Sequence, residues 1–137
     1  MKPNIIFLTV QNSKEKCLRL GDYIENAFSK GDRVLIYVGN QAVADFVDKL
    51  LWTFREESFL PHTLSEKETS DSIVITQTTK NINRATTLFN LTSQVPDHID
   101  EFKHVYELKD ETSTEKFERS RSRYNQYQLN KYSVAIL

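Results

Sequence analysis

The sequence has little cysteine, glycine or proline, and it has no large excess of charge of either sign. Its one cysteine, Cys17, cannot form a disulfide within the chain, so the composition is typical of an intracellular protein. Three glycines and three prolines exclude collagen-like and low-complexity chains. Eighteen basic and nineteen acidic residues leave a formal net charge of −1. That balance excludes a chain held to nucleic acid by bulk charge, and it excludes an acidic disordered tail.

Long hydrophobic runs are also absent. The apolar run 5–8 is far shorter than the roughly 20 residues of a membrane-spanning helix, and it lacks the basic flank and cleavage site of a signal peptide. We therefore expect a soluble, cytoplasmic protein with no membrane partner. The 137 residues are close to the commonest domain size and contain no internal repeat or domain-sized linker. Residues 1–137 are therefore expected to form a single domain.

The first part of the chain alternates between buried-strand and amphipathic-helix patterns. Residues 4–10 and 33–38 are rich in apolar and β-branched side chains, which predicts two buried strands. Between them, apolar residues recur every three or four positions as far as Gly31, which is placed to end a helix. A second helix pattern follows Asn40 and extends to about residue 54. Strand, helix, strand, helix in this order predicts a parallel α/β arrangement.

The rest of the chain adds shorter strand patterns and one long helix. Residues 56–72 are polar and are expected to be loop-rich. Strands are predicted over 73–77, 86–91 and 104–108, the last in the chain, with helical turns over 97–102 and a helix from about 113 to 130. The predicted fold class is α/β: a three-layer Rossmann-like domain with a mostly parallel sheet of about five strands flanked by helices.

An α/β sheet often binds a nucleotide, but the glycines that such a site needs are missing. In dinucleotide sites, glycines in the first strand-to-helix turn let the backbone approach phosphate. Residues 9–14 contain no glycine, and neither G-x-G-x-x-G nor G-x-x-x-x-G-K-[ST] occurs in the chain. We therefore expect no phosphate-binding loop and no cofactor. A nucleotide- or small-molecule-dependent enzyme that uses the carboxyl-terminal edge of the sheet stays open as the alternative.

Patterns typical of metal sites and nucleophiles are weak as well. His98 and His104 are six positions apart, which matches no standard zinc spacing. No serine, cysteine or carboxylate pattern accompanies His62, so a packed or surface histidine is favoured over a general base. Cys17 lies on the apolar face of the first predicted helix, where core packing is favoured over a thiolate role. We expect no catalytic residue and no metal ligand.

The last predicted helix carries the strongest functional signal. Residues 116–131 hold five basic residues against one acidic residue, a net charge of +4, and three aromatic residues. The residues that share one helix face are Phe117, Arg121, Tyr124, Asn125 and Gln128. Arginine beside aromatic rings suits an acidic peptide with an apolar end, because guanidinium binds carboxylate and the ring packs on an apolar side chain. Two other interpretations stay open: aromatic rings packed on the sheet below solvated cations, or direct binding of single-stranded DNA.

A second cluster of large apolar groups surrounds a polar loop. It comprises residues 51–54 and 58–62, which include Trp52, Phe59, Pro61 and His62. Exposed clusters of this kind mark protein interfaces. The sequence equally allows Trp52 and Phe59 to close the bottom of the core.

Several segments, in order and spacing, resemble the chi subunit of bacterial DNA polymerase III. The most specific is the stretch from LW at 51–52 to ESFLPH at 57–62. Looser matches are RVLI at 33–36, LFNL at 88–91, VP at 95–96, FKHVYEL at 102–108 and RSRYNQY at 121–127. The resemblance covers nearly the whole chain.

The resemblance implies a non-catalytic accessory subunit of the clamp-loader assembly in the replicative polymerase. Chi proteins resemble nucleotide-binding α/β domains without the phosphate loop, which agrees with the missing glycines. The resemblance also implies two protein partners. One is the psi subunit, and the other is the acidic, Phe-ended C-terminal tail of single-stranded DNA-binding protein, so that DNA is contacted only indirectly.

The same resemblance assigns residues to the two partners. For the tail, Arg121 matches the key arginine and Tyr124 the tyrosine of the family motif, and Arg123 and Tyr127 also match. Asn125 and Gln128 occupy positions where basic residues are common in the chi family. Their neutral side chains are expected to lower the affinity for an acidic tail unless Lys116, Arg119 or Lys131 compensates. The psi-facing patch is carried over to Trp52, Phe59, Pro61 and His62.

Overall fold

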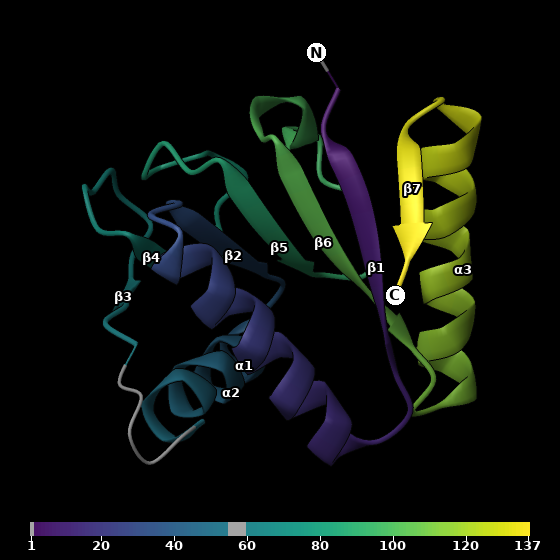
Figure 1. Cartoon of the computed structure of the whole chain (residues 1–137), viewed down its shortest axis with the longest axis horizontal. Coiled ribbons are helices and arrows are strands. Elements are labelled where there is room, and N and C mark those ends of the chain that lie inside the picture. The colour runs from purple at the N-terminus through teal and green to yellow at the C-terminus, as the bar shows by residue number, and fades with distance from the viewer. Residues whose placement is uncertain (1, 55–59) are drawn as a thin grey trace.

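The computed structural model describes residues 2–54 and 60–137, and its strands form one sheet with α-helices on both faces (Figure 1). In chain order the elements are β1 (Asn4–Val10), α1 (Ser13–Ser29), β2 (Val34–Val38), α2 (Gln41–Thr53), β3 (Thr63–Leu64), β4 (Ile73–Thr76), β5 (Thr87–Leu91), the 3-10 helix η1 (Ile99–Glu101), β6 (His104–Asp110), α3 (Thr114–Leu129) and β7 (Ser133–Ile136). Within the described residues, no helix is long and apolar enough to cross a bilayer.

The sheet has the strand order β3-β4-β2-β5-β6-β1-β7. Every pairing among the described strands is parallel, so the connections must cross from one end of the sheet to the other. The helices α1 and α3 supply two of these crossovers (Figure 1). As a result β1, the first strand of the chain, lies between β6 and β7, which are its last two strands within the described residues.

Each α-helix begins at a side-chain cap. The side-chain oxygens of Asn12, Asn40 and Ser113 accept hydrogen bonds from the backbone N–H three positions later, at 2.8, 3.0 and 3.2 Å. After α1, Gly31 adopts a φ of 86°, a conformation that glycine takes without steric cost. The predicted start of a helix after Asn40 and the predicted stop at Gly31 are thus confirmed, and the cap of α1 is Asn12.

Two hydrophobic clusters occupy the two faces of the sheet. Side chains alternate along each strand, so Leu8 and Val10 point toward α1 and α2, whereas Ile5 and Phe7 point toward α3. The cluster under α1 and α2 is the larger, and Cys17 packs at its margin. On the opposite face Tyr127 of α3 is the largest fully buried side chain. The expected three-layer α/β architecture is therefore confirmed.

Within the described residues the sheet has seven strands, where about five were expected. The additional strands are its two edges: β3, only two residues long, and β7, which follows α3. The last predicted strand was 104–108, whereas β6 extends to Asp110 and a further strand, β7, pairs with β1. The helical turns expected over 97–102 are present only as the shorter 3-10 helix η1. The turn between β1 and α1 contains no glycine, as the sequence shows.

Candidate functional site

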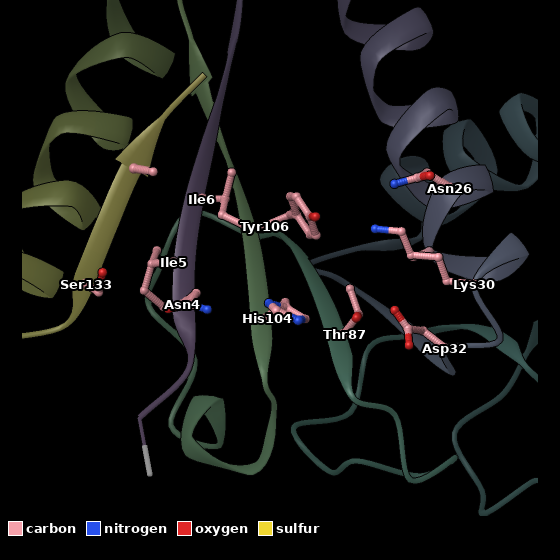
Figure 2. Close-up of a pocket in the computed structure, with 12 residues that line it drawn as sticks. Asn4, Ile5, Ile6, Asn26, Lys30, Asp32, Thr87, His104, Tyr106 and Ser133 are labelled. Carbon is pink, nitrogen blue, oxygen red and sulfur yellow. The ribbon is translucent and has the colours of Figure 1, made fainter.

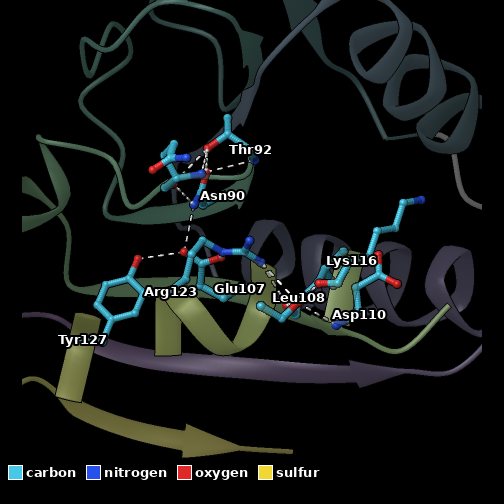
Figure 3. Close-up of polar contacts among 10 residues, drawn as sticks. Asn90, Thr92, Glu107, Leu108, Asp110, Lys116, Arg123 and Tyr127 are labelled. Carbon is cyan, nitrogen blue, oxygen red and sulfur yellow. Dashed lines mark hydrogen bonds and ion pairs between the residues drawn. The ribbon is translucent and has the colours of Figure 1, made fainter. Parts of the chain in front are cut away.

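The inward side of α3 is fixed to the sheet by a buried polar network centred on Glu107 of β6 (Figure 3). The Nε of Arg123 donates to Glu107 Oε1 at 2.9 Å, and the hydroxyl of Tyr127 donates to Oε2 at 2.7 Å. Asn90 of β5 donates to the same Oε2 at 2.8 Å. Arg123 also donates from its second guanidinium nitrogen to the Leu108 carbonyl, at 3.2 Å. Three donors therefore converge on one carboxylate between two strands and a helix.

The electrostatics of this network follow from its burial. Burial raises the pKa of Glu107, and the charge of Arg123 together with the three hydrogen bonds opposes that rise. Burial and the neighbouring Glu107 both raise the pKa of Tyr127, so its phenol stays protonated and donates. Arg123 is only 6% exposed. Arg123 and Tyr127, assigned to the tail peptide by resemblance, therefore hold α3 on the sheet, and little of either side chain is exposed.

The outward side of α3 carries the accessible part of the predicted site. The Arg121 side chain is 61% exposed, and its nearest partner is Glu118 one turn earlier, at 3.6 Å. Tyr124 is half-buried with its ring edge against Phe7, at 5.6 Å between centroids, and Gln128 donates to its hydroxyl at 2.9 Å. Asn125 is exposed on the same helix. A guanidinium and a tyrosine ring thus lie one turn apart on an open surface.

The neighbouring strand β7 adds an apolar side chain, Ile136, that was not predicted from the sequence. Ile136 pairs with Phe7 of β1, so the two side chains point to the same face of the sheet, where Tyr124 covers Phe7. Ile136 is 47% exposed. The surface beside Arg121 therefore has an apolar part made of Tyr124 and Ile136. Ile136 was missed because β7 was not predicted.

Other cations of α3 point elsewhere. Lys116, Arg119 and Arg123 line a cleft of about 690 Å³ that opens at the carboxyl ends of β5 and β6. Lys16 lies on the opposite wall of the same cleft. Acidic groups form ion pairs with cations of both walls: Arg119 pairs with Glu115 at 2.5 Å, and Lys16 pairs with Asp110 at 3.1 Å. This cleft is the edge that the alternative enzyme would use.

The second predicted surface lies at the end of α2. Trp52 is 56% exposed, and its indole N–H donates to Asp48 at 3.2 Å. His62 is held by the same carboxylate, with Nε2 2.7 Å from Asp48, and by the Leu60 carbonyl, 2.6 Å from Nδ1. Trp52 meets His62 edge to face at 5.5 Å, and Pro61 is exposed beside them. Phe59 lies outside the described residues.

The two remaining histidines lie in different surroundings. His98 is buried between Tyr37 and Phe102, with ring centroids 5.7 and 5.3 Å away. His104 lies at the start of β6, on a different face from His98. Across the described ranges, no group of three or more His, Cys, Asp or Glu residues could hold a metal ion.

Comparison with known proteins identifies a family and a relative to which the chain is similar. A model of the family described as DNA polymerase III chi subunit, HolC, matches residues 2–135. The DNA polymerase III subunit chi of Pseudomonas aeruginosa is 31% identical over 84 residues. That aligned segment spans 61% of this chain and 59% of the length of the relative.

Proposed function

Because the chain belongs to the DNA polymerase III chi subunit family, we propose that it is a non-catalytic accessory subunit of that polymerase. In this role it links the clamp loader to template DNA coated with single-stranded DNA-binding protein, by binding the acidic, Phe-ended C-terminal tail of that protein. DNA is then contacted only through the coating protein. The single observation that supports this function best is the exposed Arg121 beside the half-buried Tyr124.

The chemistry of the tail matches the two parts of this surface. A carboxylate of the tail accepts hydrogen bonds from the planar guanidinium of Arg121, which offers two parallel donors. The terminal Phe packs against Tyr124 and Ile136, which are close to each other through Phe7. Glu118 is a solvent-exposed partner of Arg121, so the peptide displaces a weak surface ion pair.

The positions that depart from the family pattern lie at the rim of this surface. Asn125 and Gln128 are both exposed and neutral, and Gln128 donates to the Tyr124 hydroxyl. Lys116, Arg119 and Lys131 are exposed cations that would compensate for them, and of these Arg119 is paired with Glu115. We assign the main electrostatic contact to Arg121 and a longer-range contribution to these lysines.

The Trp52, Pro61 and His62 surface is our proposed contact for a psi-like subunit. Trp52 offers a large, exposed aromatic ring, the side chain most often found at the centre of protein interfaces. Asp48 holds both Trp52 and His62, so the surface is ordered before a partner binds. It lies on the α2 side of the sheet, whereas Arg121 lies on the α3 side, so both partners can bind together.

Calorimetric titration with a Phe-ended acidic peptide tests the tail site. Charge-assisted hydrogen bonds contribute about 1.5–3 kcal/mol, so Arg121→Ala is expected to weaken binding about tenfold or more. Arg121→Lys keeps the charge but loses the paired donors, and we expect an intermediate affinity.

Lys49→Ala is the matched control, because Lys49 is an exposed cation on α2, on the other side of the sheet. It changes the net charge by the same amount and should leave peptide affinity unchanged. If Arg121→Ala binds the peptide as tightly as the unmodified protein, the tail site is not on this surface.

A further inference from the structure

A separate cleft lies over the amino ends of β1, β5, β6 and β7 (Figure 2). Its volume of about 510 Å³ is in the range of pockets that hold small molecules. It is on the sheet face that packs against α1, so the sheet separates it from Arg121 and Tyr124. Neither of the two protein-binding surfaces proposed above includes any of its residues.

The floor of the cleft is a row of polar side chains across four neighbouring strands. Thr87 pairs with His104, His104 with Asn4, and Asn4 with Ser133. Paired residues in a parallel sheet point to the same face, and neighbouring strands are about 4.8 Å apart. A hydroxyl, an imidazole, an amide and a second hydroxyl are therefore spaced evenly along one line.

The wall of the cleft carries one charge of each sign. Lys30 follows the last turn of α1 and Asp32 comes two residues later, and both side chains extend toward the polar row (Figure 2). In the part of the chain that the structure describes, neither forms an ion pair. Asn26, one turn before Lys30, adds an amide to the same wall. The wall thus presents an ammonium and a carboxylate to the cleft, and neither is paired within the described residues.

The hydroxyl of Thr87 has no hydrogen-bond partner in the described residues, although the residue is only 1% exposed. Nearly all buried hydroxyl groups in proteins are paired, because leaving one unpaired costs free energy. The Thr87 side chain is one of those that line the cleft (Figure 2). A polar ligand atom in the cleft would give this hydroxyl the partner that the protein does not.

We propose that this cleft binds a small zwitterion of the amino-acid class. The ligand carboxylate pairs with Lys30, and its ammonium pairs with Asp32. Both protein charges extend from one wall of the cleft, so a ligand that carries both signs close together can contact both of them. Thr87, His104 and Asn4 bind the remaining polar groups of the ligand from the floor.

Titration of the ¹⁵N-labelled protein with a panel of free L-amino acids, followed by NMR, tests the site. At least one amino acid is expected to shift the amide signals of Asn4, Thr87, His104 and Ser133 in a saturable way. The matching amino-acid amide lacks the carboxylate and the N-acetyl derivative lacks the ammonium, so both should bind more weakly. Absence of saturable shifts at these residues for every amino acid would overturn the proposal, as would equal binding of the analogues.

Thr87→Val is the sharpest variant, because it removes the hydroxyl and keeps the shape. Since that hydroxyl has no partner in the protein, the variant should fold with unchanged or higher stability, yet lose about fivefold in ligand affinity. Asp32→Asn and Lys30→Met should each lose affinity for the zwitterion. Binding of the acidic tail peptide to Thr87→Val serves as the control and should be unchanged. Undiminished amino-acid binding by Thr87→Val and by Asp32→Asn would show that the ligand does not use this cleft.

Discussion

Arg121 and Arg123 are two positions apart on α3, and their surroundings give them opposite roles. Arg121 is exposed and pairs with Glu118 across solvent, where such a pair contributes little to stability. Arg123 is buried on Glu107, and removing one member of a buried pair leaves the other charged and unpaired, at a cost of about 3–5 kcal/mol. A loss of peptide binding on substitution of Arg123 would therefore report on folding, whereas the same loss at Arg121 would report on contact.

The burial of His98 leads us to expect that the stability of the folded protein depends on pH. Burial lowers the pKa of His98, while Glu101 and Asp97 act in the opposite direction. The unfolded chain takes up a proton near pH 6.5, but native His98 does so only at lower pH. The contribution of neutral His98 to the free energy of unfolding should therefore be fully present above pH 6.5. The free energy of unfolding should decrease as the pH drops below that value. Urea denaturation across pH 7.5 to 5.5, a range set around the ordinary histidine pKa of about 6.5, measures this fall.

The control for this prediction is His98→Phe. It keeps an aromatic ring against Tyr37 and Phe102, and no hydrogen bond to His98 nitrogen is lost within the described residues. The variant should show a smaller loss of stability over the same pH range. An equal loss in both proteins would mean that other groups produce the acid sensitivity.

At the scale of elements, the contact between α1 and α2 depends on a glycine. A Cβ built at Gly21 would lie 2.2 Å from the ring of Phe54, just after α2. Gly21→Ala forces that ring to move and is expected to cost about 1–3 kcal/mol. Thermal unfolding would show this as a lower Tm.

Gly39→Ala is the matched control, because a Cβ there meets only Thr92, at 3.9 Å, an ordinary contact. It should change Tm little. If Gly21→Ala is as stable as Gly39→Ala, α1 and α2 are packed less tightly than described.

The elements also show what a sequence can predict. Helices α1, α2 and α3 and the buried strands were predictable, because each has its own hydrophobic pattern, and Gly31 marked the end of α1. Strands β3 and β7 were not, since two or four residues give no usable period and both depend on pairing with distant strands. Aromatic residues occur on both sides of α3, so its periodicity could not show that Tyr127 faces Glu107 while Tyr124 lies at the surface. The sequence-based resemblance to the chi family, in contrast, is confirmed.

At the scale of the whole molecule, charge is unevenly distributed. Residues 116–131 carry +4 while the chain as a whole carries −1, so the remaining residues are acidic. A basic helix on an acidic body attracts a short acidic peptide but repels a long phosphate backbone. This distribution favours a tail peptide over single-stranded DNA as the direct ligand of α3.

The salt dependence of peptide affinity tests whether this charge distribution contributes to binding. Affinity for the acidic peptide is expected to fall several-fold between about 0.05 and 0.5 M salt, because exposed charges are screened beyond a Debye length of about 10 Å at 0.1 M. A single-stranded oligonucleotide should bind weakly at both ends of that range. Tight, salt-sensitive oligonucleotide binding with no preference for the peptide would instead identify α3 as a DNA-binding surface.

The parallel pairing of β1 has a consequence for the order in which the chain folds. Both neighbours of β1, the strands β6 and β7, come from residue 104 onward. At a synthesis rate of about 5–20 residues per second, the first strand is synthesised roughly 5–20 s before its first partner. During that interval an apolar strand has both edges unpaired, which is the condition in which nascent chains aggregate or recruit chaperones. The architecture that places β1 between β6 and β7 (Figure 1) thus makes folding of this part of the sheet late with respect to synthesis.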